Sequence, residues 1–548
     1  MKITSKMRIC IPIIGLMSLL TLGQDHIAAL DTIFLSEQDP TGPGKVVLVA
    51  KNGNIIYKKA TGKANLELDI NMETDFVFRI GSISKQFTAF AILKLAEEGR
   101  LSLQDEISKY ISDYPVHGHT ITLEHLLTHT SGITNYTNLP KFDGNARRKD
   151  LSPKELIDFF KDEPMDFVPG EKHQYSNSGY ILLGYVIEQV SGMGYAEYLR
   201  EKFFEPLNMQ NTSYDLTPKL VNNRIPGYQY RRGGYENSDY LSMTLPYAAG
   251  SLLSTTEDLF IWNKAVMNDL LLSKESRYMA HSAYMLKSGN KVDYGLGWRL
   301  GNVQGKPSIN HGGLVNGFTS YATYLPDEQI FVVVLSNCDC TQSLNVLASK
   351  MAATVMGSPY NFKKIKMSPK RLRAFQGIYR SENGEERTIR YEDGRLLHFN
   401  KGGQKSQLQP LEKNKFQLNE SLIRLEFEKG PSGKAQGFVM KSLNSPTNWL
   451  KTNDRITSFE SISLPLDVLD RYLGEYRLSK GRIFKVVMEG KKLFGQMGGN
   501  REEIIPLNRE RFFAKNIDAL LLFDFDEEDT VKGLTIVQGK PRKALKIK

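Results

Sequence analysis

Three short motifs occur twice in the last third of the chain, in the same order each time. The two copies are 97 residues apart for the first motif and 96 for the other two. The pairs are 372–379 with 469–476, 394–397 with 490–493, and 410–416 with 506–512. Because the motifs keep their order and their spacing is nearly constant, they indicate a duplicated domain. Each copy consists of short β-type segments and turns, which predicts a small antiparallel barrel that closes its own edges.

The chain is also too long for one hydrophobic core, because it has 548 residues. A basic stretch at 363–371 separates the duplicated region from the residues before it, and a second linker runs through 454–466. We therefore predict one large domain at 24–362, followed by barrels at 368–453 and 465–548.

Residues 1–23 have the pattern of an export signal. Lys2, Lys6 and Arg8 precede an apolar run from 9 to 22, which is short for a membrane span. This pattern predicts a signal peptide and an exported protein, periplasmic or extracellular. An uncleaved N-terminal anchor is the alternative, and no other membrane association is expected.

The large domain begins and ends with strand-like segments. Residues 45–60 read as a hairpin around Asn52-Gly53, and strands return at 318–324 and 330–335 before a helix at about 342–356. The two groups of strands are separated by a helix that begins at Ser82 and by a mostly helical stretch that continues to about residue 285. This order predicts an α+β sandwich whose sheet draws strands from both ends of the domain, with a helical insert.

Ser82 and Lys85 form an S-x-x-K motif at the start of that helix. A serine hydroxyl is a poor nucleophile without a base beside it, and a lysine one turn further on lies on the same face. The motif is one of the marks of penicillin-binding proteins and class A β-lactamases. A serine N-cap followed by a solvated lysine is the alternative reading of these two residues alone.

Two further motifs complete a possible acyl-transfer site. Tyr175-Ser176-Asn177 supplies a phenol, and a nearby lysine ammonium is expected to lower the pKa of that phenol so that it can act as a base. His311-Gly312-Gly313 precedes the strand near 318. A core tyrosine, a turn asparagine and a strand-end histidine are the structural alternatives, but the three motifs together favour catalysis.

Residues 30 to about 356 resemble the serine β-lactamase and penicillin-binding superfamily, in its class C, esterase and D-aminopeptidase branch. The supporting segments are 81–88, 126–132, 169–171 with 175–177, 206–209 and 248–259. The resemblance implies that Ser82 is the acylated nucleophile and that Lys85 and Tyr175 share general-base and general-acid catalysis. It also implies an oxyanion hole made by the backbone N–H groups of Ser82 and Leu314.

The same resemblance implies that Asn177 orients the substrate amide and that His311 and Gly313 bind substrate from the strand along the cleft. His129 and Thr130 belong to a motif that we interpret as structural. A Ser-His-Asp triad is the rival mechanism, but His311 precedes any triad partner that the sequence offers.

Many β-lactamases and carboxypeptidases of this superfamily have lysine where His311 stands. Because histidine is only partly charged near neutral pH, this exchange argues against a free carboxylate as the main recognition element. The His-x-Gly form and two C-terminal lipocalin-like barrels resemble D-aminopeptidases and esterases. We predict a serine hydrolase for amide or ester bonds of a small peptide or ester. A β-lactamase or D-Ala-D-Ala carboxypeptidase, and a non-catalytic binding protein for an envelope ligand, are the alternatives.

Other partners have little support in the sequence. The net charge of +10 permits attraction to anionic surfaces, but no nucleic-acid-binding motif accompanies it. No metal or nucleotide motif is present, so no cofactor is expected. Cys338 and Cys340 are separated by one residue, which predicts strain in any bridge between them. The oligomeric state cannot be read from the sequence.

Overall fold

The computed structural model describes residues 26–36, 39–216, 218–341, 343–419, 421–454, 456, 461–478, 482–498 and 500–547. The export signal expected at 1–23 lies outside these residues and stays a prediction. The chain divides into two compact units, Met1–Tyr360 and Asn361–Lys548.

A six-stranded antiparallel sheet forms the centre of the first unit, in the order β12-β13-β14-β15-β1-β2. Its strands are β1 (Lys45–Lys51), β2 (Asn54–Thr61), β12 (Arg299–Val303), β13 (Lys306–Val315), β14 (Phe318–Leu325) and β15 (Ile330–Ser336). β1 pairs with β15 along its whole length, from Lys45 opposite Ser336 to Lys51 opposite Ile330. The predicted sheet with strands from both ends of the domain is therefore confirmed.

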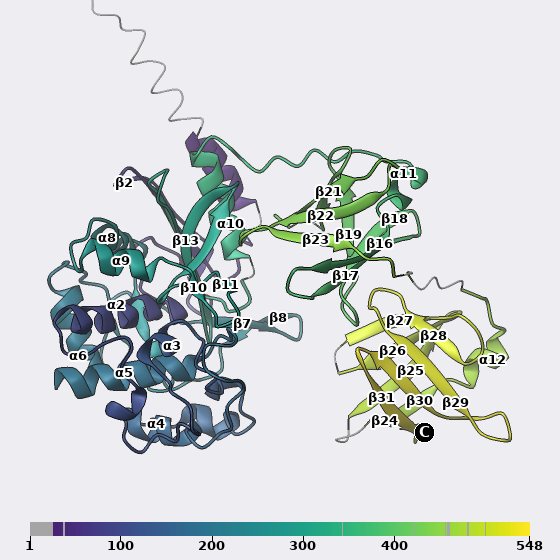
Figure 1. Ribbon diagram of the computed structural model, residues 1–548, viewed down its shortest axis with the longest axis horizontal. Coiled ribbons are helices and arrows are strands. Elements are labelled where there is room, and N and C mark those ends of the chain that lie inside the picture. The colour runs from purple at the N-terminus through teal and green to yellow at the C-terminus, as the bar shows by residue number, and fades with distance from the viewer. Residues whose placement is uncertain are drawn as a thin grey trace, which may run out of the picture. The chain divides into compact units, whose positions relative to one another are not determined.

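Helices cover both faces of this sheet (Figure 1). Val47 and Val49 of β1 pack with α10 (Leu344–Val355) and the helical residues 26–35, whereas Val46 packs with the helical insert. Alternate side chains of a strand point to opposite faces of the sheet. Because helices cover both faces here, every position along the covered part of the strand must be apolar. This arrangement is the predicted sandwich of the α+β class.

The central helix of the insert is α2 (Ser84–Glu97), which is buried on nearly every side and ends before Gly99 with φ +68°. A helix that is apolar all round belongs inside a domain. The other helices are α3 (Leu123–Leu127), α4 (Pro153–Phe160), α5 (Asn177–Ser191), α6 (Tyr195–Leu199), α7 (Tyr247–Gly250), α8 (Thr256–Met267) and α9 (Lys274–Ala280).

Short strands and one disulfide complete the first unit. The strands are β3 (Lys63–Asn65), β4 (Ile70–Asn71), β5 (Phe78–Arg79), β6 (Ser213–Tyr214), β7 (Tyr228–Arg231), β8 (Gly234–Asn237), β9 (Leu252–Ser254), β10 (Tyr284–Met285) and β11 (Lys291–Val292). Cys338 and Cys340 form a disulfide just after β15, despite the single residue between them. No helix in the described ranges has the length and apolar character that a membrane crossing needs.

The second unit contains two closed eight-stranded barrels, as the repeat predicted. The first consists of β16 (Gly377–Ser381), β17 (Glu386–Glu392), β18 (Arg395–Phe399), β19 (Ser406–Pro410), β20 (Lys415–Leu418), β21 (Arg424–Lys429), β22 (Ala435–Lys441) and β23 (Thr447–Lys451). The second consists of β24 (Gly474–Leu478), β25 (Ile483–Glu489), β26 (Lys492–Met497), β27 (Asn500–Pro506), β28 (Arg511–Ala514), β29 (Leu520–Phe525), β30 (Val531–Gln538) and β31 (Lys540–Lys546). A short helix precedes each barrel, α11 (Pro369–Arg373) and α12 (Leu466–Asp470).

The first repeated motif has the same role in both barrels. The Tyr379 hydroxyl donates to the Phe375 carbonyl at 2.6 Å, and the Tyr476 hydroxyl donates to the Tyr472 carbonyl at 2.7 Å. Each tyrosine is buried and ties the first strand of its barrel to the turn before it. In both barrels the repeated motif therefore provides a hydrogen-bond acceptor for a buried tyrosine hydroxyl.

Candidate active site

Ser82 lies in one turn of 3-10 helix, η1 (Gly81–Ile83), which leads directly into α2. Gly81 has φ +51°, and a side chain there would come within 2.9 Å of the Leu314 backbone nitrogen in β13. Only glycine tolerates both this backbone conformation and this approach. The turn therefore holds Ser82 beside the strand that carries His311 and Gly313.

Lys85 is fully buried, and no carboxylate pairs with it within the described part of the chain. The Lys85 Nζ atom lies 3.2 Å from Ser82 Oγ, 2.8 Å from Asn177 Oδ1 and 2.8 Å from the Ala249 carbonyl oxygen. A neutral amine fits these neighbours, because its two hydrogens satisfy the two carbonyl-type oxygens and its lone pair faces the serine hydroxyl.

Burial, and then the charge of Arg299, lower the pKa of Lys85 well below its ordinary value. Desolvation penalises the charged ammonium, and no carboxylate offsets that penalty. Lys85 is therefore the group best suited to accept the Ser82 proton.

Tyr175 does not have the lowered pKa that the sequence predicted. Burial raises the pKa of Tyr175 to about 12, although the Ser82 hydroxyl and the Arg299 charge both act to lower it. Its buried hydroxyl has no well-formed hydrogen bond to any described residue. The expectation of a lowered pKa is wrong because the desolvation penalty exceeds the effect of the nearby positive charge. The phenol stays protonated at neutral pH and suits the role of proton donor.

Asn177 is the first residue of α5 and brings a side-chain amide to both Lys85 and the cleft. Its backbone N–H donates to Asn135 Oδ1 at 3.1 Å, which helps to fix the start of the helix. The predicted neighbours Ser82, Lys85 and Asn177 are thus brought together from two helices.

His311 is almost fully buried in β13 and acts as a neutral side chain. Its Nδ1–H donates to the Gly312 carbonyl at 2.7 Å, and its Nε2 accepts from the Tyr294 hydroxyl at 3.0 Å. Burial, and then the charge of Arg299, lower the pKa of His311 to about 3. At neutral pH this position therefore carries no cation.

Gly313 lets β13 pack against the serine turn, because a side chain there would overlap the Ile80 carbonyl oxygen. The next residue, Leu314, has a 66% exposed side chain and lines the cleft together with Ser82. The two proposed oxyanion-hole residues thus border the same space.

The cleft at Ser82 has a volume of about 260 Å³. Gly81, Ser82, Asn177 and Leu314 line it, whereas Lys85, Tyr175, His311 and Gly313 lie outside its lining. The remaining wall is mostly apolar and aromatic, with one cation and two uncharged polar residues: Tyr136, Thr137, Phe142, Arg147, Leu241, Pro246, Ala249, Gly250, Val315 and Asn316. No cluster of His, Cys, Asp or Glu that is suited to hold a metal occurs among the described residues.

Comparison with known proteins places this site in a family. Residues 35–355, more than half of the chain, match the family model described as Beta-lactamase. The chain belongs to the beta-lactamase family. The predicted superfamily is therefore confirmed, and this beta-lactamase family protein is a serine hydrolase of the β-lactamase and penicillin-binding type.

Individual relatives agree with this assignment. Penicillin-binding protein 4* of Bacillus subtilis (strain 168) is 28% identical over 446 residues, which cover 77% of this chain and 98% of that protein. A D-stereospecific amidohydrolase from Streptomyces sp. is 26% identical with a TM-score of 0.52, covering 59% of this chain and 97% of its own. D-amino acid amidase from Ochrobactrum anthropi SV3 shares the fold, with 22% identity and a TM-score of 0.55. The match covers 61% of this chain and 99% of the amidase chain.

Arg299 is a site residue that the sequence analysis missed. Its guanidinium carbon lies 5.3 Å from the centre of the Tyr175 ring and 5.7 Å from that of Tyr294. The residue is exposed on β12, where it pairs in register with Asn310, the neighbour of His311. The sequence signal that could have placed Arg299 is Gln304-Gly305, a turn dipeptide between β12 and β13. Both residues have positive φ at the tip of this hairpin. In this family member a cation therefore stands next to the neutral histidine.

His129 supports the loop that carries Tyr175, as the structural interpretation predicted. Its Nδ1 accepts from the Ser176 backbone N–H at 3.2 Å, and its ring centre lies 4.2 Å from that of Tyr175. Burial lowers the pKa of His129 well below its ordinary value, so the ring is neutral. A neutral, packed imidazole orders Tyr175 and adds no further charge near Lys85.

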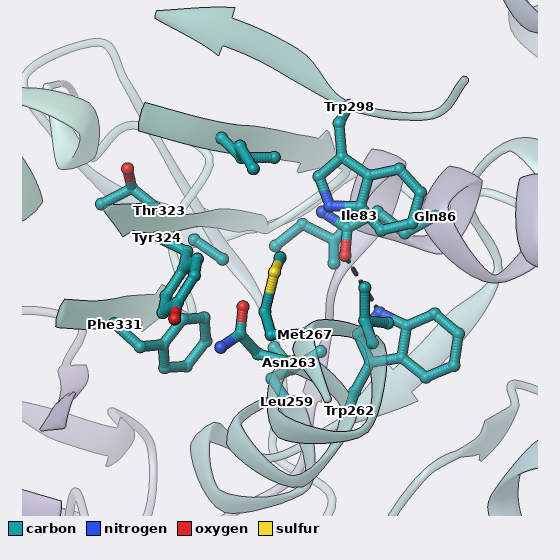
Figure 2. Close-up of a pocket in the computed structure, with 13 residues that line it drawn as sticks. Ile83, Gln86, Leu259, Trp262, Asn263, Met267, Trp298, Thr323, Tyr324 and Phe331 are labelled. Atoms are coloured by element: carbon teal, nitrogen blue, oxygen red, sulfur yellow. Dashed lines mark hydrogen bonds between the residues drawn. The ribbon is translucent and has the colours of Figure 1, made fainter. Parts of the chain in front are cut away.

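A separate cavity lies against α2, but it is too small for a substrate (Figure 2). Its volume is about 20 Å³, which is enough for about one water molecule. The Trp262 indole N–H donates to Gln86 Oε1 at 3.2 Å along its wall. Buried Thr323 Oγ1, which also lines it, has no partner among the described residues, so a water molecule fits there.

Proposed function

We propose that the protein hydrolyses amide or ester bonds, in D-amino-acid-containing peptides or small esters, through an acyl-enzyme on Ser82. The observation that carries this proposal is the buried Lys85 amine, which contacts Ser82 and whose hydrogen-bond partners among the described residues are all neutral. The Streptomyces relative described as a D-stereospecific amidohydrolase supports an amide substrate of D configuration.

In the acylation step Lys85 accepts the Ser82 proton while Oγ bonds to the substrate carbonyl carbon. The carbonyl electron pair moves to oxygen, where the backbone N–H groups of Ser82 and Leu314 stabilise the negative charge. When the pair returns, the C–N or C–O bond breaks and Tyr175 donates its proton to the leaving group. The Lys85 ammonium then returns a proton to the Tyr175 phenolate.

Deacylation repeats the step with water as nucleophile. Neutral Lys85 accepts a proton from the water molecule as its oxygen bonds to the acyl carbon. The ester bond to Ser82 breaks, the carboxylic acid leaves, and Lys85 gives its proton to Ser82 Oγ. Asn177 holds the acyl amide through its side chain in the cleft.

Arg299 favours a second candidate, a substrate with a free carboxylate such as a D-Ala-D-Ala peptide or a penicillin. A guanidinium is always charged and binds carboxylates in two-point geometry, so it can replace the cation that His311 does not supply. The similarity to penicillin-binding protein 4* also supports this candidate.

A substrate panel tests both candidates: D-aminoacyl amides, D-Ala-D-Ala peptides, p-nitrophenyl esters and nitrocefin, each with wild type and Ser82→Ala. We expect turnover of amides or esters by wild type and none by Ser82→Ala. If Arg299 binds a carboxylate, Arg299→Gln raises KM about tenfold for the carboxylate substrates alone. Activity that survives in Ser82→Ala, or no fluorophosphonate adduct on Ser82, contradicts the acyl-enzyme.

We also propose that the enzyme acts outside the cytoplasm. The charged and apolar pattern of residues 1–23 supports export. The test is cell fractionation followed by N-terminal sequencing of the mature protein. A cytoplasmic protein that retains residues 1–23 contradicts the proposal.

A further inference from the structure

The positive charge of the chain is concentrated in the barrels. Residues 361–548 contain 37 Lys and Arg against 24 Asp and Glu, a net charge of +13. The first 360 residues have a net charge of −3, which together give the total of +10. The barrel unit therefore attracts anions, whereas the catalytic unit does not account for the basic character of the protein.

The interior of the first barrel is not available to a ligand, because aromatic rings fill it. Phe375, Phe416 and Phe427 have ring centres 4.8 to 5.4 Å apart, and Phe438 stacks on Trp449 at 5.7 Å. Equivalent rings of Tyr472, Phe512 and Phe523 pack inside the second barrel. A small barrel filled by side chains has no room for a guest.

The two barrels meet at a seam made by residues 402–405 of the first and 515–518 of the second. The Lys405 N–H donates to the Asn516 carbonyl at 2.7 Å, and the Asp518 N–H donates to the Gly403 carbonyl at 2.8 Å. The Gly402 N–H donates to Asp518 Oδ2 at 2.9 Å. Backbone hydrogen bonds therefore fix the side chains on either side of the seam.

A cavity of about 640 Å³ opens at this seam. Four cations and two carboxylates are among its lining residues: Arg390, Glu392, Asp393, Arg395, Lys405 and Lys515. Aromatic and amide side chains from both barrels line the rest of it, among them Tyr391 and Phe513. The volume is larger than one small anion needs and suits a segment of a longer molecule.

The two most buried cations of the cavity, Arg390 and Lys405, share the carboxylate of Glu392, whereas Lys515 pairs with Glu503 at 2.7 Å. The Lys405 side chain is 3% exposed and the Arg390 side chain 9% exposed, and both pair with Glu392, at 3.1 Å and 2.5 Å. Burial lowers the pKa of Lys405 although Glu392 and the more distant Asp518 act to raise it. Arg395, at the cavity rim, has no ion-pair partner among the described residues.

We propose that the seam cavity binds a segment of a polyanionic polymer, with one carboxylate or phosphate group seated against Lys405 and Arg395. Arg395 supplies a guanidinium for two-point contact with the anion, and the shielding of Lys405 from solvent strengthens its attraction to the anion. The barrels are then a polymer-binding module, and this role does not depend on the hydrolytic reaction at Ser82.

The test measures binding of the full-length protein to fluorescent poly-D-glutamate and to polyphosphate, with neutral dextran as a control. Inorganic phosphate and free D-glutamate compete as monomers. We expect binding of at least one polyanion that weakens with salt, no binding of dextran, and a loss of at least tenfold in affinity for Arg395→Gln and Lys405→Met. The polyanion that binds identifies the source of the charged group.

Lys434→Met is the matched control, because Lys434 is an exposed cation of the same barrel that does not line the cavity. We expect its affinity to stay within twofold of wild type. Arg395→Gln keeps the test decisive if Lys405→Met fails to fold, because Arg395 is exposed. No binding of either polyanion, an equal loss in Lys434→Met, or unchanged affinity in Arg395→Gln overturns the proposal.

Discussion

The catalytic unit and the barrel unit each contain a lysine side chain that is shielded from solvent, but the groups around the two lysines differ. Within the described ranges Lys85 has no carboxylate partner, and its Nζ contacts a hydroxyl, an amide oxygen and a backbone carbonyl. The Lys405 side chain is 3% exposed and pairs with Glu392 at 3.1 Å. Burial lowers the pKa of both lysines, and the pKa of Lys85 falls well below its ordinary value.

The difference shows how one residue type serves two purposes. Without a carboxylate, a buried lysine gives up its proton readily and becomes a base. With a carboxylate beside it, the ammonium is retained and remains available as a fixed cation. The partner of the lysine, together with the degree of its burial, therefore separates a catalytic site from a binding site in this protein.

The largest expected effect comes from removing the base. Lys85→Met should lower kcat by roughly 1,000-fold or more, because a positioned general base contributes about 100- to 10,000-fold. Lys85→Arg should be equally inactive, since a guanidinium keeps the charge but cannot accept a proton. Steady-state kinetics on the best substrate of the panel measure both. An active Lys85→Arg would show that Lys85 acts only as a cation.

The second effect tests the paired lysine. Glu392→Gln leaves Arg390 and Lys405 without their shared carboxylate and should cost about 3 kcal/mol of unfolding free energy. Urea denaturation of the full-length protein measures it. The control is Glu412→Gln, which breaks the exposed pair with Lys415 and should cost about 0.5 kcal/mol or less. Equal losses in the two variants would contradict the special role of the buried pair.

The third effect converts one lysine environment into the other. Asn177→Asp places a carboxylate 2.8 Å from Lys85 and should raise its pKa. Because the neutral amine is the active form, the acid limb of the pH profile of kcat should move upward by about 1 to 2 pH units. Asn138→Asp, at an exposed position, should leave the limb in place. A downward shift would assign the base to another group.

The smallest effect compares the two barrels. Tyr379→Phe and Tyr476→Phe each remove one buried hydrogen bond to a backbone carbonyl and should each cost about 1 kcal/mol. Denaturation of each variant measures the loss. A marked difference between the two would show that the repeated motif no longer has the same role in both copies.

Much of the fold was predictable because its signals are local. The motif spacing of 96 and 97 residues predicted two equivalent barrels, and the strands at both ends of the first domain predicted one shared sheet. The order of Ser82, Lys85, Tyr175 and Asn177 predicted the family and the neighbours of the nucleophile. The pKa of Tyr175 was predicted in the wrong direction because burial depends on residues far away in the chain.

The sequence by itself determined the residue types available for catalysis, the strand and helix pattern, and the duplication of the barrels. Only the tertiary structure decided which of these groups carry charge. It buried Lys85 and His311 among neutral partners, placed Arg299 beside Tyr175, and joined the two barrels around Lys405. The physical reason is that ionisation depends on desolvation and on charges within a few ångströms, and long-range contacts set both.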